Sequence, residues 1–271
     1  MNYKLLFNLS NKTALITGAA GLLGVEFAKG LAAHQCNLIL VDSDGDKLKE
    51  VGKDINNNYD VNCNTFCCNI TDQQSVDDLS SKIKGDNCII DILINNVASK
   101  GLDLDNYFAE VEKYSIETWN EILNYNLTSM FIMTKIFGSV MAERGNGSII
   151  QTSSIYGVMA PDQRIYKGSI FLDREINTPA IYSASKAGVI GLTKYLATYW
   201  ASAGVRVNTL TPGGVYSGQN KTFVEKYSER VPMNRMADKS ELVGAVVFLS
   251  SDASSYITGQ NLIVDGGLNC W

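Results

Sequence analysis

Strand-like and helical runs alternate along almost the whole length of the 271-residue chain. Short apolar runs rich in β-forming residues recur between longer stretches of helical composition. This alternation is typical of a parallel sheet with helices packed on both faces. The pattern therefore predicts an α/β fold built on a doubly wound parallel sheet. The expected strands are 13–17, 37–41, 63–67, 89–94, 147–152, 205–210 and 261–264, and the helical stretches include 22–33, 72–84, 117–143 and 180–203.

No internal repeat, low-complexity tract or linker divides this pattern, so residues 1–271 are expected to form a single domain. With 45% hydrophobic residues, the chain can bury a substantial core. One stretch, at about 157–179, holds no clear period and carries both charges and aromatics. We interpret it as an inserted loop, and long ordered loops are usually functional or mobile.

The first strand-like run leads directly into a glycine-containing turn and then a helix. Glycine lets the backbone approach a pyrophosphate closely, and the free N–H groups at a helix start bind anions. A strand, glycine turn and helix in this order predict a dinucleotide site. The residues expected to contact the pyrophosphate are Gly18, Gly21, Leu22, Leu23 and Gly24.

Asp42 ends the second strand, about 20 residues past the turn, where a ribose-binding acid is expected. A carboxylate accepts from the 2′ and 3′ hydroxyls and repels a 2′-phosphate. No Arg or Lys lies directly beside Asp42. We therefore expect NAD in preference to NADP. The alternative is that Asp42 merely caps the following helix.

Tyr182 and Lys186 are four residues apart in a helical stretch, so they share one helix face. A phenol titrates near 10 and is a poor base at neutral pH. A neighbouring ammonium favours the phenolate and lowers its pKa. The pair is a candidate proton-transfer device for alcohol and carbonyl chemistry.

With these features in order, the chain resembles the short-chain dehydrogenase/reductase family over nearly its whole length. The segment Asn95–Ala98 is similar to the family's NNAG motif, with Ala98 where glycine is usual. Further matches are Asn126, Ser154, the segment from Pro212 to Ser217, and the C-terminal Asp265-Gly266-Gly267. The resemblance implies a Rossmann fold that binds a nicotinamide cofactor.

The resemblance assigns a catalytic tetrad to Asn126, Ser154, Tyr182 and Lys186. Tyr182 would exchange the proton, Ser154 would donate to the substrate oxygen, and Asn126 would hold a water. Lys186 would lower the pKa of Tyr182 and bind the nicotinamide ribose. The further cofactor contacts that it implies are Asn69, Ile70, Asn96, Val97, Ala98, Pro212, Gly213, Val215 and Ser217.

Three departures from the family pattern stand out. Leu22 occupies the place of a common glycine, and Asn69 stands where an Asp often contacts adenine. The segment 155–181 between Ser154 and Tyr182 is longer than usual. That insertion and the tail 258–267 are similar to family members of flagellin-modification and nonulosonic-sugar pathways.

Three functions are compatible with these residues. The first is an NAD(H)-dependent oxidoreductase acting on a sugar or nucleotide-sugar in surface-glycan or flagellin-glycan biosynthesis, with Arg164, Tyr166 and Lys167 as candidate substrate contacts. The second is a generic carbonyl or 3-oxoacyl thioester reductase. The third is a non-catalytic nucleotide-binding regulator, against which the intact tetrad argues.

Composition limits the partners. The net charge of −5 and pI near 5.0 argue against nucleic acid and anionic membranes. The sequence indicates a cytoplasmic protein with reduced thiols. Cys63, Cys67 and Cys68 could ligate a metal, but the only histidine, His34, is distant, and we expect no metal. The resemblance implies a homo-oligomer, a tetramer or dimer, built through 117–143, 180–203 and the end near 261–271.

Overall fold

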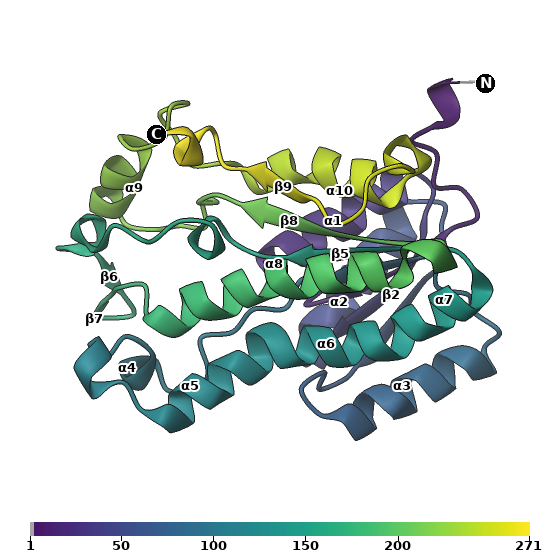
Figure 1. The fold of residues 1–271 in the computed structure, drawn as a ribbon, viewed down its shortest axis with the longest axis horizontal. Helices are drawn as coiled ribbons and strands as arrows, with labels where there is room; N and C mark the ends of the chain where they lie inside the picture. The colour runs from purple at the N-terminus through teal and green to yellow at the C-terminus, as the bar shows by residue number, and fades with distance from the viewer. Residues whose placement is uncertain (1–2) are drawn as a thin grey trace.

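The computed structural model describes residues 3–271 and confirms the doubly wound sheet (Figure 1). Its seven strands are parallel and lie in the order β3-β2-β1-β4-β5-β8-β9. The order reverses between β1 and β4, and ligands of such sheets bind at that switch point. The strands are β1 (Thr13–Thr17), β2 (Asn37–Asp42), β3 (Cys63–Cys67), β4 (Ile92–Asn95), β5 (Gly147–Thr152), β8 (Val205–Pro212) and β9 (Asn261–Val264).

Helices cover both faces of the sheet, each over its own apolar cluster (Figure 1). One cluster joins the sheet to α1 (Leu22–Ala33), α2 (Gly45–Asn58) and α10 (Val243–Ser250). The other joins it to α3 (Gln73–Gly85), to a long helix over 116–144 and to α8 (Ala180–Trp200). This two-faced burial explains why β1, β4 and β5 are buried at every position.

Ser115 caps the start of the long helix, because its hydroxyl accepts from the backbone N–H of Thr118. It confirms the helical stretch expected over 117–143, but its backbone is not uniform. Two π-helical turns interrupt it, at Asn124–Thr128 and Thr134–Gly138. Such turns often occur at functional sites. The α-helical parts are α5 (Ile116–Leu123), α6 (Ser129–Met133) and α7 (Ser139–Arg144).

Smaller elements gather at the end of the molecule beyond the carboxyl ends of the strands (Figure 1). They include α4 (Leu104–Tyr107) and α9 (Lys221–Ser228), and α9 packs on the inserted segment through Phe223 and Tyr227. Short 3-10 turns complete the chain. They are Tyr3–Leu5, Val111–Lys113, Ile155–Gly157, Gln163–Tyr166, Ala201–Ala203, Lys239–Leu242, Asp252–Ser254 and Leu268–Cys270.

The inserted segment 157–179 is more regular than the sequence suggested. It holds a 3-10 turn and an antiparallel hairpin of two-residue strands, β6 (Ile170–Phe171) and β7 (Arg174–Glu175). Positive φ angles at the two intervening residues make the tight turn. Strands this short leave no readable alternation, which is why the sequence did not reveal them.

Two contacts hold the insertion in place. The Arg174 guanidinium pairs with Asp105 in α4. The side-chain amide of Asn177 donates to the Phe108 carbonyl (2.7 Å). Within the insertion, the side-chain amide of Gln163 donates to the Thr178 carbonyl (2.7 Å). The segment therefore forms a fixed wall against α4.

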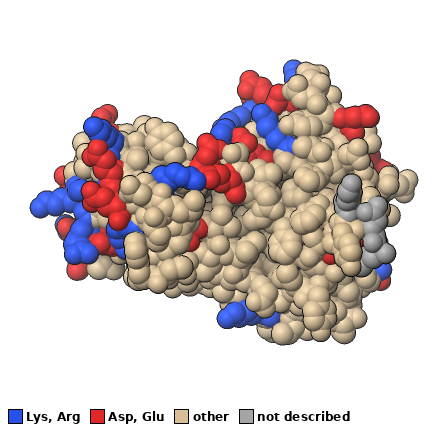
Figure 2. Space-filling view, turned by 90° about the horizontal axis from the view of Figure 1, so that it is seen from above, with Lys and Arg blue, Asp and Glu red and all other residues tan. Residues whose placement is uncertain are grey.

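The distribution of surface charge and the hydropathy of the helices indicate which classes of partner the protein can bind. On the face drawn in Figure 2, Lys and Arg lie among Asp and Glu, and broad areas carry no charge. That face offers no continuous basic surface for nucleic acid. Among residues 3–271, no helix has both the length and the hydropathy needed to cross a membrane.

Candidate active site

The turn after β1 requires glycine at two positions. Gly18 has a φ of +64°, which favours glycine, and a Cβ on Gly24 would lie 2.1 Å from the Gly18 carbonyl oxygen. Helix α1 follows at once, and its N-cap, Gly21, provides no side-chain cap for the first N–H groups. These groups can hold a pyrophosphate, so the turn fits a dinucleotide. Leu22 is exposed at this turn, while Leu23 packs against the core.

Asp42 lies at the edge of the same turn. Its Oδ2 accepts from the Ala20 N–H (2.9 Å) and its Oδ1 accepts from the Asp44 N–H (3.1 Å). The cap of α2 is Asp44, whose side chain accepts from the Lys47 N–H. The helix-capping interpretation of Asp42 is therefore wrong, and its carboxylate remains beside the turn.

The loop after β4 borders the turn, and the loop after β3 lies beside Asp42, whose carbonyl accepts from the Cys68 N–H (3.0 Å). Asn69 is exposed and its Oδ1 accepts from the Thr71 N–H (3.1 Å), whereas Ile70 is buried. The Asn96 side chain donates to the Gly18 carbonyl (3.3 Å), and Val97 lies against Gly18. The adenine and ribose contacts expected here are thus grouped around the switch point.

Lys186, on α8, is 1% exposed, and its ammonium donates to the Thr152 carbonyl at the end of β5 (3.0 Å). Burial lowers the pKa of Lys186 to about 8. The helix backbone is held as well, because the Ser153 hydroxyl donates to the Lys186 carbonyl (2.7 Å). A Cβ on Gly157 would lie 2.6 Å from the Lys186 carbonyl carbon, so glycine permits this close approach.

Tyr182 lies one helical turn before Lys186, with the Ser154 side chain beside it. Burial raises the pKa of Tyr182, and the Ser154 hydroxyl opposes that rise without cancelling it. Lys186 is not among the causes of this shift, so the expected lowering of the Tyr182 pKa by Lys186 stays a prediction. The tyrosine is held as a proton donor at neutral pH, with Ser154 beside it.

Asn126 lies in the first π-helical turn and is fully buried. Its Oδ1 accepts from the Ser99 N–H (2.9 Å), and its Nδ2 donates to the Ser185 hydroxyl (3.3 Å). The residue thereby connects the loop after β4 to α8. The structure places Asn126 as a support for the tetrad, while its contact with a water stays a prediction.

A cavity of about 460 Å³ opens beside Tyr182 and Ser154. It lies against the loops after β4 and β8, the insertion and α9. Pro212 ends β8 and begins the loop that supplies part of this lining. Of the residues expected at the site, those that line the cavity are Ala98, Ser154, Tyr166, Tyr182, Gly213, Val215 and Ser217.

Of the three residues expected to contact a substrate, Arg164 and Lys167 lie outside this cavity. The Arg164 side chain is 91% exposed, pairs with Asp162 (2.8 Å) and does not line the cavity. Lys167 is exposed and also lies outside it. Only Tyr166 faces the cavity, where it is buried beside Tyr156. The structure thus places Arg164 and Lys167 outside the catalytic cavity, because charge in a loop does not indicate which way the side chain points.

Sequence reasoning missed Lys100, Phe108 and Phe171, all of which line the cavity. The Lys100 ammonium lies 4.0 Å from the centre of the Phe171 ring and 5.7 Å from that of Phe108. Lys100 stands only two residues after the NNAG-like segment, and that proximity was the available signal. Its contact with Phe171 depends on the fold of the insertion, which the sequence did not reveal.

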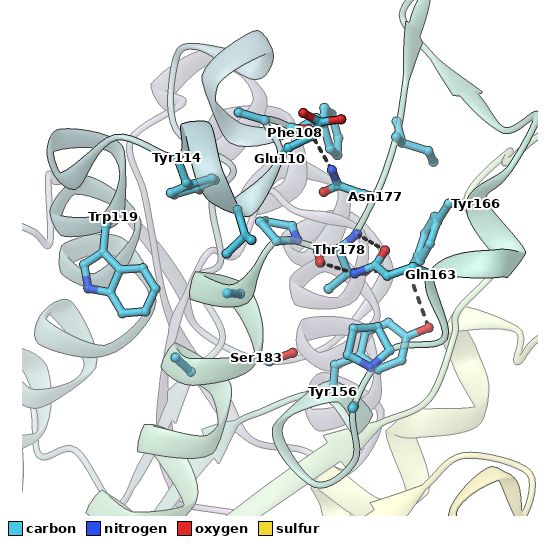
Figure 3. A pocket seen from close by; sticks show the side chains of 18 of the residues that line it. Phe108, Glu110, Tyr114, Trp119, Tyr156, Gln163, Tyr166, Asn177, Thr178 and Ser183 are labelled. Atoms are coloured by element: carbon cyan, nitrogen blue, oxygen red, sulfur yellow. Dashed lines mark hydrogen bonds between the residues drawn. The ribbon is translucent and has the colours of Figure 1, made fainter.

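A larger hollow of about 1280 Å³ lies outside the catalytic cavity, between α5, the insertion and the start of α8 (Figure 3). We call it the outer groove. In Figure 3, Tyr114 and Trp119 stand opposite Gln163 and Tyr166. Three buried polar atoms of its lining have no hydrogen-bond partner, namely the Tyr114 hydroxyl, Asn177 Oδ1 and the Ser183 hydroxyl. Neither Tyr182 nor Lys186 lines it, so the candidate chemistry is in the inner cavity.

Within residues 3–271, no group of three or more His, Cys, Asp or Glu side chains is placed to hold a metal ion. The cysteines in this part of the chain are free thiols, and burial raises the pKa of Cys63 to about 12. A buried neutral thiol is a poor ligand until it loses its proton.

Comparison with known proteins agrees with this geometry. Residues 18–269 match the family model described as enoyl-(acyl carrier protein) reductase. The gluconate 5-dehydrogenase of Gluconobacter oxydans is 32% identical over 99% of this chain and 98% of its own length. The 3-oxoacyl-[acyl-carrier-protein] reductase FabG of Escherichia coli is also 32% identical, over 96% of this chain and 98% of its own.

Solved structures extend the comparison to the whole fold. A short-chain dehydrogenase from Leptospira borgpetersenii, determined with bound NAD+, is 32% identical with a TM-score of 0.82, and the match covers 96% of this chain and 94% of that one. A gluconate 5-dehydrogenase from Burkholderia cenocepacia, in complex with NADP and tartrate, is 26% identical with a TM-score of 0.85 and 98% coverage of both chains.

Burial of the Lys186 ammonium leads to a prediction about the stability of the protein. Below pH 8 both the folded and unfolded states carry the Lys186 proton, and only the folded state bears the cost of desolvation. Between about pH 8 and 10.5 the unfolded state binds more protons, so this group makes wild-type stability rise with pH. We expect Lys186→Met to melt a few degrees higher than wild type at pH 7, and the difference to shrink toward pH 10.

Thermal melts of both proteins across this pH range test the prediction. Lys194→Met, at an exposed position of the same helix, is the matched control and should show no pH-dependent difference. A Lys186→Met variant that melts below wild type at pH 7 would contradict the argument.

Proposed function

Because the chain belongs to the short-chain dehydrogenase/reductase family, we propose that it is an NAD(H)-dependent oxidoreductase of secondary alcohols and ketones on polyhydroxylated, sugar-type substrates. The observation that carries the proposal is the meeting of Ser154, Tyr182 and Lys186 at the carboxyl ends of the strands. This cluster lies beside a turn that fits a dinucleotide.

Tyr182, Ser154 and Lys186 have distinct roles in the proposed reaction. Tyr182 gives its proton to a substrate carbonyl oxygen, or takes one from the alcohol, and Ser154 donates a hydrogen bond to the same oxygen. The Lys186 ammonium, one turn away, favours negative charge on the Tyr182 oxygen as the proton moves. The nicotinamide, when bound, supplies the hydride acceptor or donor.

The cavity lining supports a polyhydroxylated substrate. Hydroxyl and amide side chains around it can exchange hydrogen bonds with a sugar-type chain, and the gluconate 5-dehydrogenase relative acts on such a compound by its name. The second candidate is 3-oxoacyl thioester reduction, which the similarity to FabG favours. Nucleotide binding without catalysis has less support, because the tetrad is intact. The roles in surface-glycan or flagellin-glycan synthesis stay predictions from the sequence alone.

Tyr182→Phe tests the chemistry. The variant keeps the ring and removes the transferable proton, so turnover should fall by roughly 10²-fold or more. The measurement is NADH formation or consumption at 340 nm, with sugar alcohols, sugar acids and a 3-oxoacyl thioester as alternative substrates. Tyr256→Phe, at a fully exposed position, should leave the rate unchanged. Undiminished turnover of the best substrate by Tyr182→Phe would overturn the mechanism.

Asp42 should set the cofactor preference, since relatives bind either NAD+ or NADP. We expect wild type to bind NADH more tightly than NADPH, because the carboxylate repels a 2′-phosphate. Asp42→Ala should narrow that difference in fluorescence titrations. Asp46→Ala removes the same charge from an exposed position in α2 and should leave the preference intact. Tighter binding of NADPH to wild type would disprove the role of Asp42.

Exposed apolar residues support a homo-oligomer. Ile116, Phe131, Tyr195 and Tyr199 are each at least 47% exposed on the long helix and α8, and large exposed apolar patches mark association sites. Strand β9 is an edge of the sheet, and Trp271 beyond it is 77% exposed in the single chain. We expect light scattering at micromolar concentration to report a dimer or tetramer, with two-fold symmetry the common form. A monomer at that concentration would refute the proposed homo-oligomer.

The cytoplasmic location stays a prediction from the sequence.

A further inference from the structure

In the part of the chain that the structure describes, Lys100 is the only charged residue that lines the catalytic cavity. Its side chain remains accessible, and desolvation lowers its pKa. Among residues 3–271, no Asp or Glu lies within ion-pair distance of its ammonium. The cavity therefore presents one positive charge that no carboxylate of the described chain neutralises.

Two aromatic rings hold that charge in position. The ammonium lies 4.0 Å from the centre of the Phe171 ring, which belongs to the hairpin of the insertion, and 5.7 Å from that of Phe108. An aromatic face attracts a cation but, unlike a carboxylate, does not neutralise its charge. The rings therefore orient Lys100 while leaving its N–H groups free to bind an anion.

The backbone before Lys100 is fixed from the catalytic side. Asn126 accepts from the Ser99 N–H, and the Ser99 hydroxyl accepts from the Gly101 N–H (3.0 Å). On the other side, Arg174 and Asn177 join the insertion to α4 and Phe108. Both walls of the site are thus fixed relative to Tyr182, which allows Lys100 to position a substrate rather than merely attract it.

We propose that Lys100 determines substrate specificity by binding a carboxylate on the substrate, so that the preferred substrate is a small polyhydroxy acid. This inference rests on the proposed oxidoreductase function and names its substrate class. A single ammonium matches a monoanion, whereas phosphate groups usually receive several cationic or N–H donors. The cavity of about 460 Å³ is at the small end for ligand sites, which suits a short sugar acid better than a nucleotide-sugar.

Binding to the NADH-loaded protein tests the assignment without requiring turnover. The probes are C4–C6 aldonates and the matching alditols, which differ by a carboxylate in place of a hydroxymethyl group. We expect wild type to bind its best aldonate roughly 10- to 100-fold more tightly than the matching alditol, as a charge-assisted hydrogen bond would produce. Lys100→Met should remove that difference and leave alditol binding unchanged, while Lys100→Arg should retain most of it.

Several results would overturn the proposal. The first is that wild type binds aldonate and alditol with equal affinity. The second is that Lys100→Met loses affinity for aldonate and alditol to the same extent. The third is that inorganic phosphate binds through Lys100 more tightly than aldonate does. Melting temperature and NADH affinity should be unchanged in Lys100→Met, which confirms that the variant folds. If aldonates bind through Lys100 but no alcohol or ketone is turned over, the proposed reaction fails while the carboxylate site stands.

Discussion

The common direction of β1, β4, β5 and β8 is the constraint on which the site depends. Parallel strands bring their carboxyl ends to one edge, so Gly18, Asn96, Ser154 and Gly213 meet although they are far apart in the sequence. The register also decides which side chains face which layer, because a slip of one residue would turn each side chain to the opposite face. The apolar clusters on both faces hold that register, and the chemistry depends on them.

The site also contains interactions that oppose stability. The ammonium of Lys186 is buried with one carbonyl as its partner, and Thr152 has a side-chain hydroxyl nearby without a hydrogen bond. Buried charges and unsatisfied polar atoms are unfavourable in a folded protein. Proteins retain such groups where function requires them, and the surrounding apolar core offsets their cost.

The sequence predicted the parts of the molecule that depend on local patterns. All seven strands of the central sheet were located, because they are short runs rich in β-forming residues, although 89–94 begins three residues before β4. The glycine turn after β1 was located as well. The hairpin of the insertion was missed, since its strands have two residues each. Arg164 was chosen and Lys100 was overlooked for one reason: a side chain's direction depends on tertiary contacts, here Asp162 for the former and Phe171 for the latter.

The wall between the catalytic cavity and the outer groove is one side chain thick. The residues that line both are Phe108, Tyr156, Tyr166, Ile176, Asn177 and Thr178. A molecule that fills the outer groove would therefore contact residues that also line the catalytic cavity. If it alters their positions, binding at the two sites is coupled, and by thermodynamic linkage the coupling is reciprocal. If a second subunit covers the groove, specific activity will depend on enzyme concentration, and substrate will in turn promote assembly.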